Sequence, residues 1–264
     1  MSSRRPLFLL IPGLLGLAFI AIPPFALLIQ TPWSSLSAIV TSDVTLSALR
    51  LSLFVSVIAT AIAFIVGTPL AWLLAHDSLP WGRLWRALVI VPLLLPPVVS
   101  GVALLSAFGR RGSVGGPIYD LFGFQIPFST AAVVLASAFV AMPFLVITME
   151  GAFRSLDHEI EDAAMVDGAS ARQVYWKITL PLVAPSLIAG TVLAWARAVG
   201  EFGATITFAG NLEGVTQTMP LAVYTALESD RDVAIGMSVV LVVIAVGILV
   251  ALRGYYLPGQ RMKG

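Results

Sequence analysis

Cysteine is absent from this chain of 264 residues. That absence excludes disulfide bonds, cysteine-ligated zinc, iron–sulfur clusters and thiol nucleophiles. Charge is also scarce, because only 11% of the residues are charged and the formal net charge is +1. Such a chain lacks the basic surface that nucleic-acid binding requires, so we expect no nucleic-acid partner.

Motifs of catalysis and nucleotide binding are missing as well. The chain contains no G-x-x-x-x-G-K-[ST] loop, no H-E-x-x-H and no G-x-S-x-G. Its two histidines, His76 and His158, are far apart in sequence and near the expected ends of apolar segments. We interpret them as solvated polar residues rather than metal ligands. We therefore expect a non-catalytic protein that binds no metal or cofactor itself.

Hydrophobic residues, in contrast, make up 58% of the chain, and its mean hydropathy is +0.96. A soluble fold could not cover so much apolar surface, and uncharged runs of about 20 residues indicate helices that cross a bilayer. We predict an all-α integral membrane protein with a single transmembrane domain over residues 1–264. Six runs reach spanning length: Pro6–Gln30, Leu46–Ala75, Ala87–Phe108, Ser129–Glu150, Leu180–Ala209 and Val233–Leu252.

Four of these runs carry further information. The first follows two arginines, as a signal peptide would, but its apolar part is too long for a typical signal and no clear A-x-A site follows, so we interpret it as an uncleaved span. The second and fifth runs exceed the spanning length and should tilt, bend or protrude. Pro69 and the Pro96–Pro97 pair predict kinks or broken helices.

Lysine and arginine predict the orientation of the chain. Ten of them fall at one set of ends and loops, four at the other, and Arg197 lies inside a span. The positive-inside rule places the richer set, with both termini, in the cytoplasm. Loops 31–45, 109–128 and 210–232 would then face outward. The ten are Arg4, Arg5, Arg83, Arg86, Arg154, Arg172, Lys177, Arg253, Arg261 and Lys263, and the four are Arg50, Arg110, Arg111 and Arg231.

One cytoplasmic segment, residues 152–179, is acidic and has the pattern of a helix rather than a span. Its small and apolar residues recur at helical spacing, with acids on the other faces. Ser155 is a candidate N-cap, and Gly168 supplies the left-handed conformation that commonly ends a helix. Ser170 and Gln173 have the spacing of a capping box for a second short helix. The apolar positions are Leu156, Ile160, Ala163 and Ala164, and the acids are Asp157, Glu159, Glu161 and Asp162.

Two environments suit such an amphipathic segment. Helices that lie in the lipid interface usually carry lysine and arginine on their polar face, because cytoplasmic lipids are anionic. The polar face here is acidic, so insertion into a groove of a partner protein is favoured over packing at the interface.

The same segment resembles the E-A-A motif of bacterial ABC-importer permeases. The matching residues are Asp162-Ala163-Ala164, then Gly168, then Ile178, Leu180 and Pro181. Asp162 stands where that family has glutamate, so the charge is kept. The resemblance implies a coupling helix that docks into a cleft on a cytoplasmic ATPase, and we call residues 152–179 the coupling loop.

The fifth run holds two charged residues, Arg197 and Glu201. They are four positions apart, so they are expected to share one helix face and to pair. Charges inside a membrane face the bundle interior or a pathway, and Gly200 and Gly203 should let another helix or a hydrated path approach. Two readings stay open: the cluster, with Thr205, lines or gates an anion pathway, or the pair is a structural lock between spans.

Residues 196–211, together with 216–220, 224–225 and 92–101, resemble the molybdate permeases of the molybdate and sulfate group of ABC importers. The resemblance covers nearly the whole chain and implies a type I importer fold in a bacterial cytoplasmic membrane. It also implies a homodimer in contact with membrane lipid, an ATPase dimer that uses ATP and Mg²⁺, and an extracytoplasmic molybdate-binding protein. Tungstate would also be admitted. A sulfate or thiosulfate permease and an ion-coupled secondary transporter are the alternatives.

Overall fold

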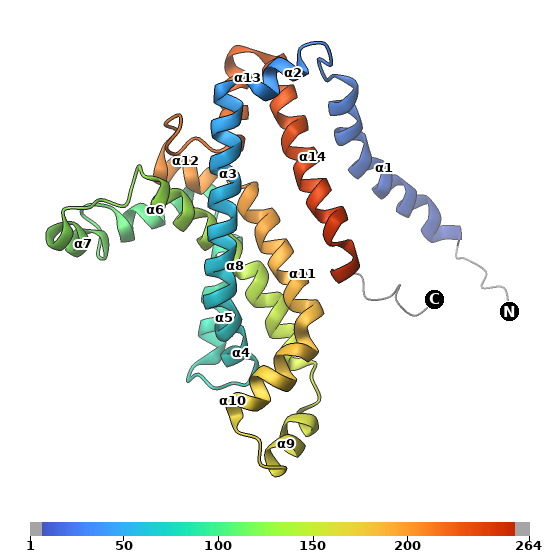
Figure 1. Ribbon diagram of the computed structural model, residues 1–264, viewed down its shortest axis with the longest axis vertical. Helices are drawn as coiled ribbons and strands as arrows, with labels where there is room; N and C mark the ends of the chain where they lie inside the picture. Colours follow the sequence, from blue (N-terminus) through green and yellow to red (C-terminus); the bar gives the residue numbers. More distant parts are fainter. Residues whose placement is uncertain (1–6, 257–264) are drawn as a thin grey trace.

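The computed structural model describes residues 7–256, which form helices and connecting loops only (Figure 1). The expected all-α membrane fold is therefore confirmed. The elements, in order, are α1 (Leu7–Ile29), α2 (Leu36–Thr41), α3 (Asp43–Ile62), η1 (Ala63–Gly67), α4 (Thr68–Ala75), α5 (Gly82–Leu94), α6 (Pro97–Phe108), α7 (Gly115–Phe122), α8 (Thr130–Arg154), α9 (His158–Val166), α10 (Ala171–Val174), η2 (Tyr175–Thr179), α11 (Leu180–Val199), α12 (Gly203–Ala209), α13 (Met219–Ser229) and α14 (Arg231–Tyr256).

Helix α8 is the centre of the bundle. It packs against α3, α4, α5, α11 and α12, and 61% of the residues in its apolar stretch are buried. Alanines such as Ala136 and Ala141 lie fully buried along it, while Leu145, Met149 and Phe153 fill the core toward its end. Small residues let membrane helices approach closely, because packing rather than hydrophobic burial holds them together there.

Five helical segments of residues 7–256 are long and apolar enough to cross a membrane. A sixth span exists only if α5 and α6 together count as one, because the chain bends by 120° between these two helices. Pro96 explains the bend: it lacks an N–H, and it forces the preceding Leu95 into an extended conformation with ψ 134. The third predicted span is thus a broken span, as its proline pair indicated.

Two other prolines follow short π-helical segments. Pro69 lies just after η1, and Pro181 lies just after η2. A proline inside a helix removes one hydrogen bond and its ring pushes against the carbonyl four residues earlier, so the preceding turn widens. The second span therefore continues through Pro69 as a single helical segment of 33 residues, Asp43–Ala75.

The fifth span differs from the prediction at both ends. Its helical segment begins at Ala171, inside the coupling loop, and ends at Val199 rather than at Ala209. Gly200 forms the C-cap, and the chain turns before a separate short helix, α12, starts at Gly203. The predicted first and last spans correspond to α1 and α14, which lie side by side (Figure 1).

The two ends of the bundle hold different short helices. Helices α2 and α13 lie at one end and α9 and α10 at the other, while α6 and α7 extend sideways (Figure 1). The start of α1 and the end of α14 both point away from α2 and α13, toward the end of the bundle that holds α9 (Figure 1). Each loop that we expect to face outward contains a short helix: α2, α7 or α13. The terminal residues 1–6 and 257–264, with Arg4, Arg5, Arg261 and Lys263, lie outside the described part of the chain.

Glycine permits the close contact between α6 and α12. A Cβ added to Gly101 would lie 2.5 Å from the Cβ of Thr207 and 2.9 Å from the carbonyl oxygen of Ala204. A Cβ on Gly203 would overlap the Cβ of Pro97. Both positions therefore need glycine for steric reasons, and the expected close approach at Gly203 is confirmed.

We predict that Gly101→Ala destabilises the protein by about 1–3 kcal/mol, because overpacking forces α6 and α12 apart. The change is measured as a lower Tm of the purified protein in detergent. Gly151→Ala in α8 is the control, since a Cβ there meets nothing within 4 Å. Equal melting of the two variants would contradict the tight α6–α12 contact.

Candidate functional site

The coupling loop forms two short helices joined by a sharp turn. The cap of α9 is Asp157, whose Oδ1 accepts a hydrogen bond from the N–H of Glu159 at 3.1 Å. Ser155, the predicted cap, instead ends α8 and donates its hydroxyl to the carbonyl of Ala152 at 2.8 Å. That prediction was wrong because α8 extends to Arg154, which leaves Ser155 at the end of α8 rather than before α9.

The turn after α9 has the geometry that the sequence predicts. Gly168 has φ +90, the left-handed region that only glycine adopts without strain, and its N–H donates to Met165 at 3.1 Å. Ser170 and Gln173 form the capping box: the N–H of Ser170 donates to Gln173 Oε1 at 2.8 Å, and that of Gln173 donates to Ser170 Oγ at 3.4 Å. These local bonds fix the angle between α9 and α10.

Helix α9 carries large apolar side chains that no other part of the described chain covers. Ile160 is 45% exposed, Met165 47% and Val166 87%. Asp162 and Ala163 are also exposed, and Ala164 is half-buried. Exposed apolar side chains bordered by acids form a surface suited to a groove on another protein.

Glu161, next to Asp162, points into the protein instead. Its carboxylate accepts a short hydrogen bond from the hydroxyl of Thr179 in η2 and lies 3.7 Å from His76 Nε2 at the end of α4. Only 13% of its side chain and 18% of that of His76 is exposed. Glu161 thus joins α9 to the segments that lead into the second and fifth spans. The motif drew attention to Asp162, and Glu161 was missed as a contact residue.

The interpretation of His76 as a solvated residue was wrong. Its ring stacks on Trp72 with centroids 4.3 Å apart, and its Nδ1 lies 2.9 Å from the Trp72 carbonyl oxygen. The side chain of His158 lies outside the described residues. Across the described part of the chain, no cluster of three metal-ligating side chains occurs.

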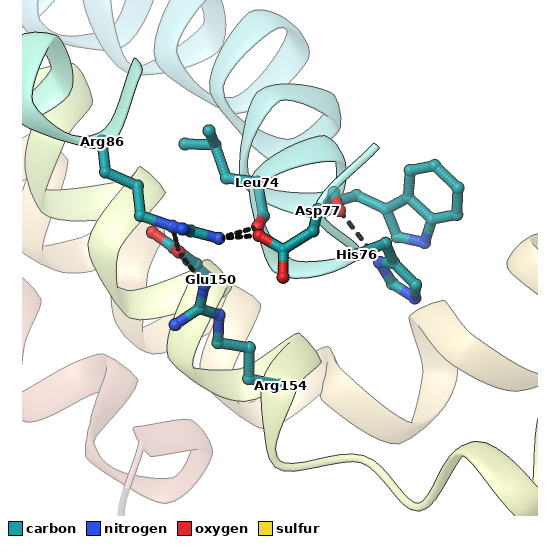
Figure 2. Close-up of polar contacts among 7 residues, drawn as sticks. Leu74, His76, Asp77, Arg86, Glu150 and Arg154 are labelled. Atoms are coloured by element: carbon teal, nitrogen blue, oxygen red, sulfur yellow. Dashed lines mark hydrogen bonds and ion pairs between the residues drawn. The ribbon is translucent and has the colours of Figure 1, made fainter. Parts of the chain in front are cut away.

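A second polar network holds the same end of the bundle (Figure 2). Arg86 in α5 lies at its centre: its Nη2 donates to Leu74 O and to Asp77 Oδ1, both at 2.6 Å, and its Nε donates to Glu150 Oε1 at 2.7 Å. Arg154 lies 3.1 Å from the same oxygen of Glu150. The Arg86 guanidinium lowers the pKa of Asp77 below its usual value, so the contact is charged at neutral pH. The sequence had shown Arg86 and Arg154 only as cytoplasmic positive charges.

The remaining coupling residues lie where the loop enters the membrane segment. Ile178 is half-buried in η2, Leu180 is half-buried at the start of α11, and Pro181 is exposed in its first turn. They connect α9 to α11, a helix of 20 residues that is about 30 Å long. The coupling loop and the charged pair therefore lie at opposite ends of one helix.

Arg197 and Glu201 form the predicted pair, with Arg197 Nη2 2.6 Å from Glu201 Oε2. They do not share one helix, because α11 ends at Val199. The carboxylate of Glu201 is 1% exposed, and its Oε1 accepts the N–H of Ala204 at 2.8 Å, at the start of α12. The pair therefore joins the end of α11 to the start of α12 across the helix break.

The other candidate pathway residues differ in position. Thr205 is fully buried in α12, and its hydroxyl has no hydrogen-bond partner among the described residues. Gly203 is buried against Pro97, whereas Gly200 is exposed and a Cβ there would meet only ordinary contacts. No other helix of the described residues approaches Gly200, so the close approach expected there stays a prediction. Arg197, with 28% of its side chain exposed, is the charged residue of this cluster that reaches the surface.

Comparison with known proteins identifies the family. Residues 63–264 match the family described as "Binding-protein-dependent transport system inner membrane component". The chain belongs to this family of ABC-importer permeases. It is a multi-pass membrane subunit of a kind that works with an ATPase and a binding protein.

Similar proteins carry consistent names. The chain is 43% identical over 240 residues to "Molybdenum transport system permease protein ModB" of Mycobacterium tuberculosis, covering 91% of this chain and 90% of that protein. It is 44% identical over 182 residues to the protein of the same name in Escherichia coli, covering 69% and 80%. It is also 31% identical over 260 residues to "Probable sulfate transport system permease protein cysT" of Zygnema circumcarinatum, covering 97% and 90%.

Solved structures confirm the type I importer fold. A chain of a bacterial alginate ABC transporter, in complex with an alginate-bound periplasmic protein, superposes with a TM-score of 0.73 at 17% identity, covering 96% of this chain and 94% of that one. A chain of the MetNI methionine ABC transporter superposes with a TM-score of 0.65 at 17% identity, covering 84% and 100%. At such identities the likeness concerns the fold alone.

We predict that Glu161→Ala loosens α9 while Asp162→Ala does not. Only Glu161 ties α9 to Thr179 and His76, whereas Asp162 is exposed. Hydrogen exchange of the α9 amides, followed by mass spectrometry, should rise about 10- to 100-fold in the first variant, because losing a hydrogen bond to a charged group costs about 1.5–3 kcal/mol. Equal exchange in both variants would show that Glu161 does not hold the helix.

We predict that Arg197→Met lowers stability strongly, by about 3–5 kcal/mol, because it leaves the buried Glu201 carboxylate without its cation. The double variant Arg197→Met/Glu201→Gln should recover most of the loss, since glutamine still accepts the Ala204 N–H without a charge. Melting temperatures in detergent measure both variants. A double variant no more stable than the single one would mean that the charge pair is not the source of the loss.

Proposed function

We propose that this chain is the permease subunit of an ABC importer that carries molybdate, and also tungstate, across the cytoplasmic membrane of a bacterium. The observation that carries the proposal is the exposed apolar and acidic surface of α9, a helix joined to α10 by the turn at Gly168 and the capping box. The names of the most similar relatives support the cargo.

The coupling loop receives the movement of an ATPase. Ile160, Met165 and Val166 would enter a groove on that subunit, with Asp162 at its edge and Ala163 and Ala164 allowing a close approach. Gly168 sets the turn, while Ile178, Leu180 and Pro181 join the loop to α11. A displacement of α9 would then move α11 as a rigid rod, because its backbone hydrogen bonds lie within the helix.

The proposal extends to the partners of this chain. A homodimer would place one pathway between two copies, with two ATPases below the coupling loops and a molybdate-binding protein at the α2 and α13 end. The excess of lysine and arginine supports a cytoplasmic location for the α9 end and for both termini. ATP and Mg²⁺ would act in the ATPase, and this chain itself would bind no cofactor and catalyse no reaction.

Arg197, Glu201, Gly203 and Thr205 are the proposed pathway residues. The pair lies at the far end of α11 from the coupling loop, where movement of α11 would change its contact with α12. Because Arg197 and Glu201 neutralise each other, they form no deep trap for an anion, which suits a site that must release its cargo. The contacts of Glu201 with Arg197 and Ala204 are also those that a structural lock between α11 and α12 requires.

Sulfate is the second candidate cargo, favoured by the likeness to the sulfate permease of Zygnema over 97% of this chain. An ion-coupled transporter that works alone would leave the exposed face of α9 without a role, and we do not favour it.

We predict ATP-dependent uptake of labelled molybdate into proteoliposomes that hold this chain, its ATPase and the external binding protein. Uptake should stop when any component is omitted and should resist an equal concentration of sulfate. Competition by sulfate would reassign the cargo and leave the mechanism intact. Uptake by this chain alone would overturn the assignment to an ABC importer.

The same assay tests the coupling loop. We predict that Gly168→Pro lowers uptake at least tenfold, because proline cannot adopt φ +90 and the turn must rearrange. Gly123→Pro is a matched control, since Gly123 also has positive φ, +66, but lies at the end of α7, away from the loop. A loss of the same size in both variants would point to misfolding rather than to coupling.

A further inference from the structure

A groove of about 630 Å³ lies on the side of the bundle between two walls. One wall comes from η1 and α4, with Phe64, Ile65 and Thr68, and the other from α10 and η2, with Arg172 and Trp176. Both π-helical segments of the described chain thus border it. The second wall is part of the coupling loop, so the groove lies at the opposite end of α11 from the charged pair, and the function proposed above assigns it no ligand.

The lining changes from polar to apolar along the groove. Arg172 lies in the first turn of α10, within the coupling loop, whereas Phe64 and Ile65 lie deeper in the second span. Trp72 and Tyr175 lie between these ends, with ring centroids 6.3 Å apart, and Trp176 packs beside Tyr175 at 5.3 Å. Tryptophan and tyrosine favour the level of lipid headgroups, so the aromatic residues mark the membrane interface.

Two polar groups of the lining lack partners. The side chain of Thr68 is buried, its residue being 5% exposed, and its hydroxyl has no hydrogen-bond partner among residues 7–256. Arg172 forms no ion pair with any residue that the structure describes. Leaving a buried hydroxyl without a partner is unfavourable in free energy, so a ligand that accepts a hydrogen bond from it would be stabilised there.

These positions match one kind of molecule. We propose that the groove binds an anionic phospholipid of the cytoplasmic leaflet. Its phosphate would pair with Arg172. An ester carbonyl would accept a hydrogen bond from the Thr68 hydroxyl, and one acyl chain would lie over Phe64 and Ile65. The rise of a helix places Thr68 about 6 Å deeper than Trp72, roughly the depth of the ester groups below the headgroup.

Charge selects the anionic lipid over a zwitterionic one. Basic sites at the cytoplasmic ends of membrane helices attract anionic headgroups, and arginine binds phosphate with two parallel hydrogen bonds. The acids of α9 precede the Gly168 turn, while Arg172 follows it on a separate helix. A bound lipid would bridge α4 and η2, the two segments that Glu161 also joins to α9 through His76 and Thr179.

Native mass spectrometry of the intact transporter complex tests the site. The complex is purified with mixed phosphatidylglycerol and phosphatidylcholine, and the lipids it retains are counted. We expect the wild type to keep about one phosphatidylglycerol per copy of this chain and to release phosphatidylcholine. Arg172→Gln should lower that retention about tenfold, and Thr68→Val, which keeps the shape of the side chain, should lower it several-fold.

Lys177→Gln is the matched control. Lys177 is an exposed basic residue of η2 that does not line the groove, so its loss should leave retention unchanged. Equal losses in Arg172→Gln and Lys177→Gln would mean only general attraction to the surface and would overturn the proposal. Retention of both lipids alike would do the same. So would an efficient disulfide between two copies carrying Ile65→Cys, because the groove would then be covered by protein.

Discussion

Proline governs where the helices of this protein bend. A membrane helix must satisfy its own backbone hydrogen bonds, and each proline removes one N–H from that set. At Pro96 the helix breaks and α6 leaves the bundle, whereas at Pro69 and Pro181 the preceding turn widens and the helix continues. The same chemical loss therefore breaks the helix at Pro96 and widens a turn before Pro69 and Pro181. Pro143 and Pro185, in contrast, lie inside α8 and α11 without interrupting them. The broken span positions α6 against α12, and the two widened turns form the walls of the groove.

Charged side chains inside the bundle are few, and they are paired with polar or charged partners. Each pair joins helices that are separate elements along the chain. Glu161 connects the loop helix α9 to two spans, Arg86 connects α4, α5 and α8, and the pair of Arg197 and Glu201 connects α11 to α12. Since removing one member of a buried pair costs more than the pair contributes, these contacts favour movement of whole elements over separation of the pairs.

The sequence predicted those features that depend on neighbouring residues. The turn at Gly168 and the capping box of Ser170 use partners within a few positions, so their spacing was sufficient. The contacts of Glu161 with Thr179, 18 positions away, and of Arg86 with Glu150, 64 positions away, depend on how the helices pack. No local pattern carries that information. The end of α11 at Val199 had a local signal in Gly200 and Glu201, but it was missed because apolar residues resume in α12 and the two helices were taken as one span.

The exposure of α1 has a consequence for biosynthesis. This helix packs against α14, and Gln30 at its end bonds Arg231, which is 201 positions later in the chain. At about 5–20 residues per second, the ribosome needs roughly 10–40 s to make the intervening chain. During that interval α1 must remain in the bilayer without α14. Its mean hydropathy of 2.2 and its lack of buried surface are the properties of a helix that is stable in lipid on its own.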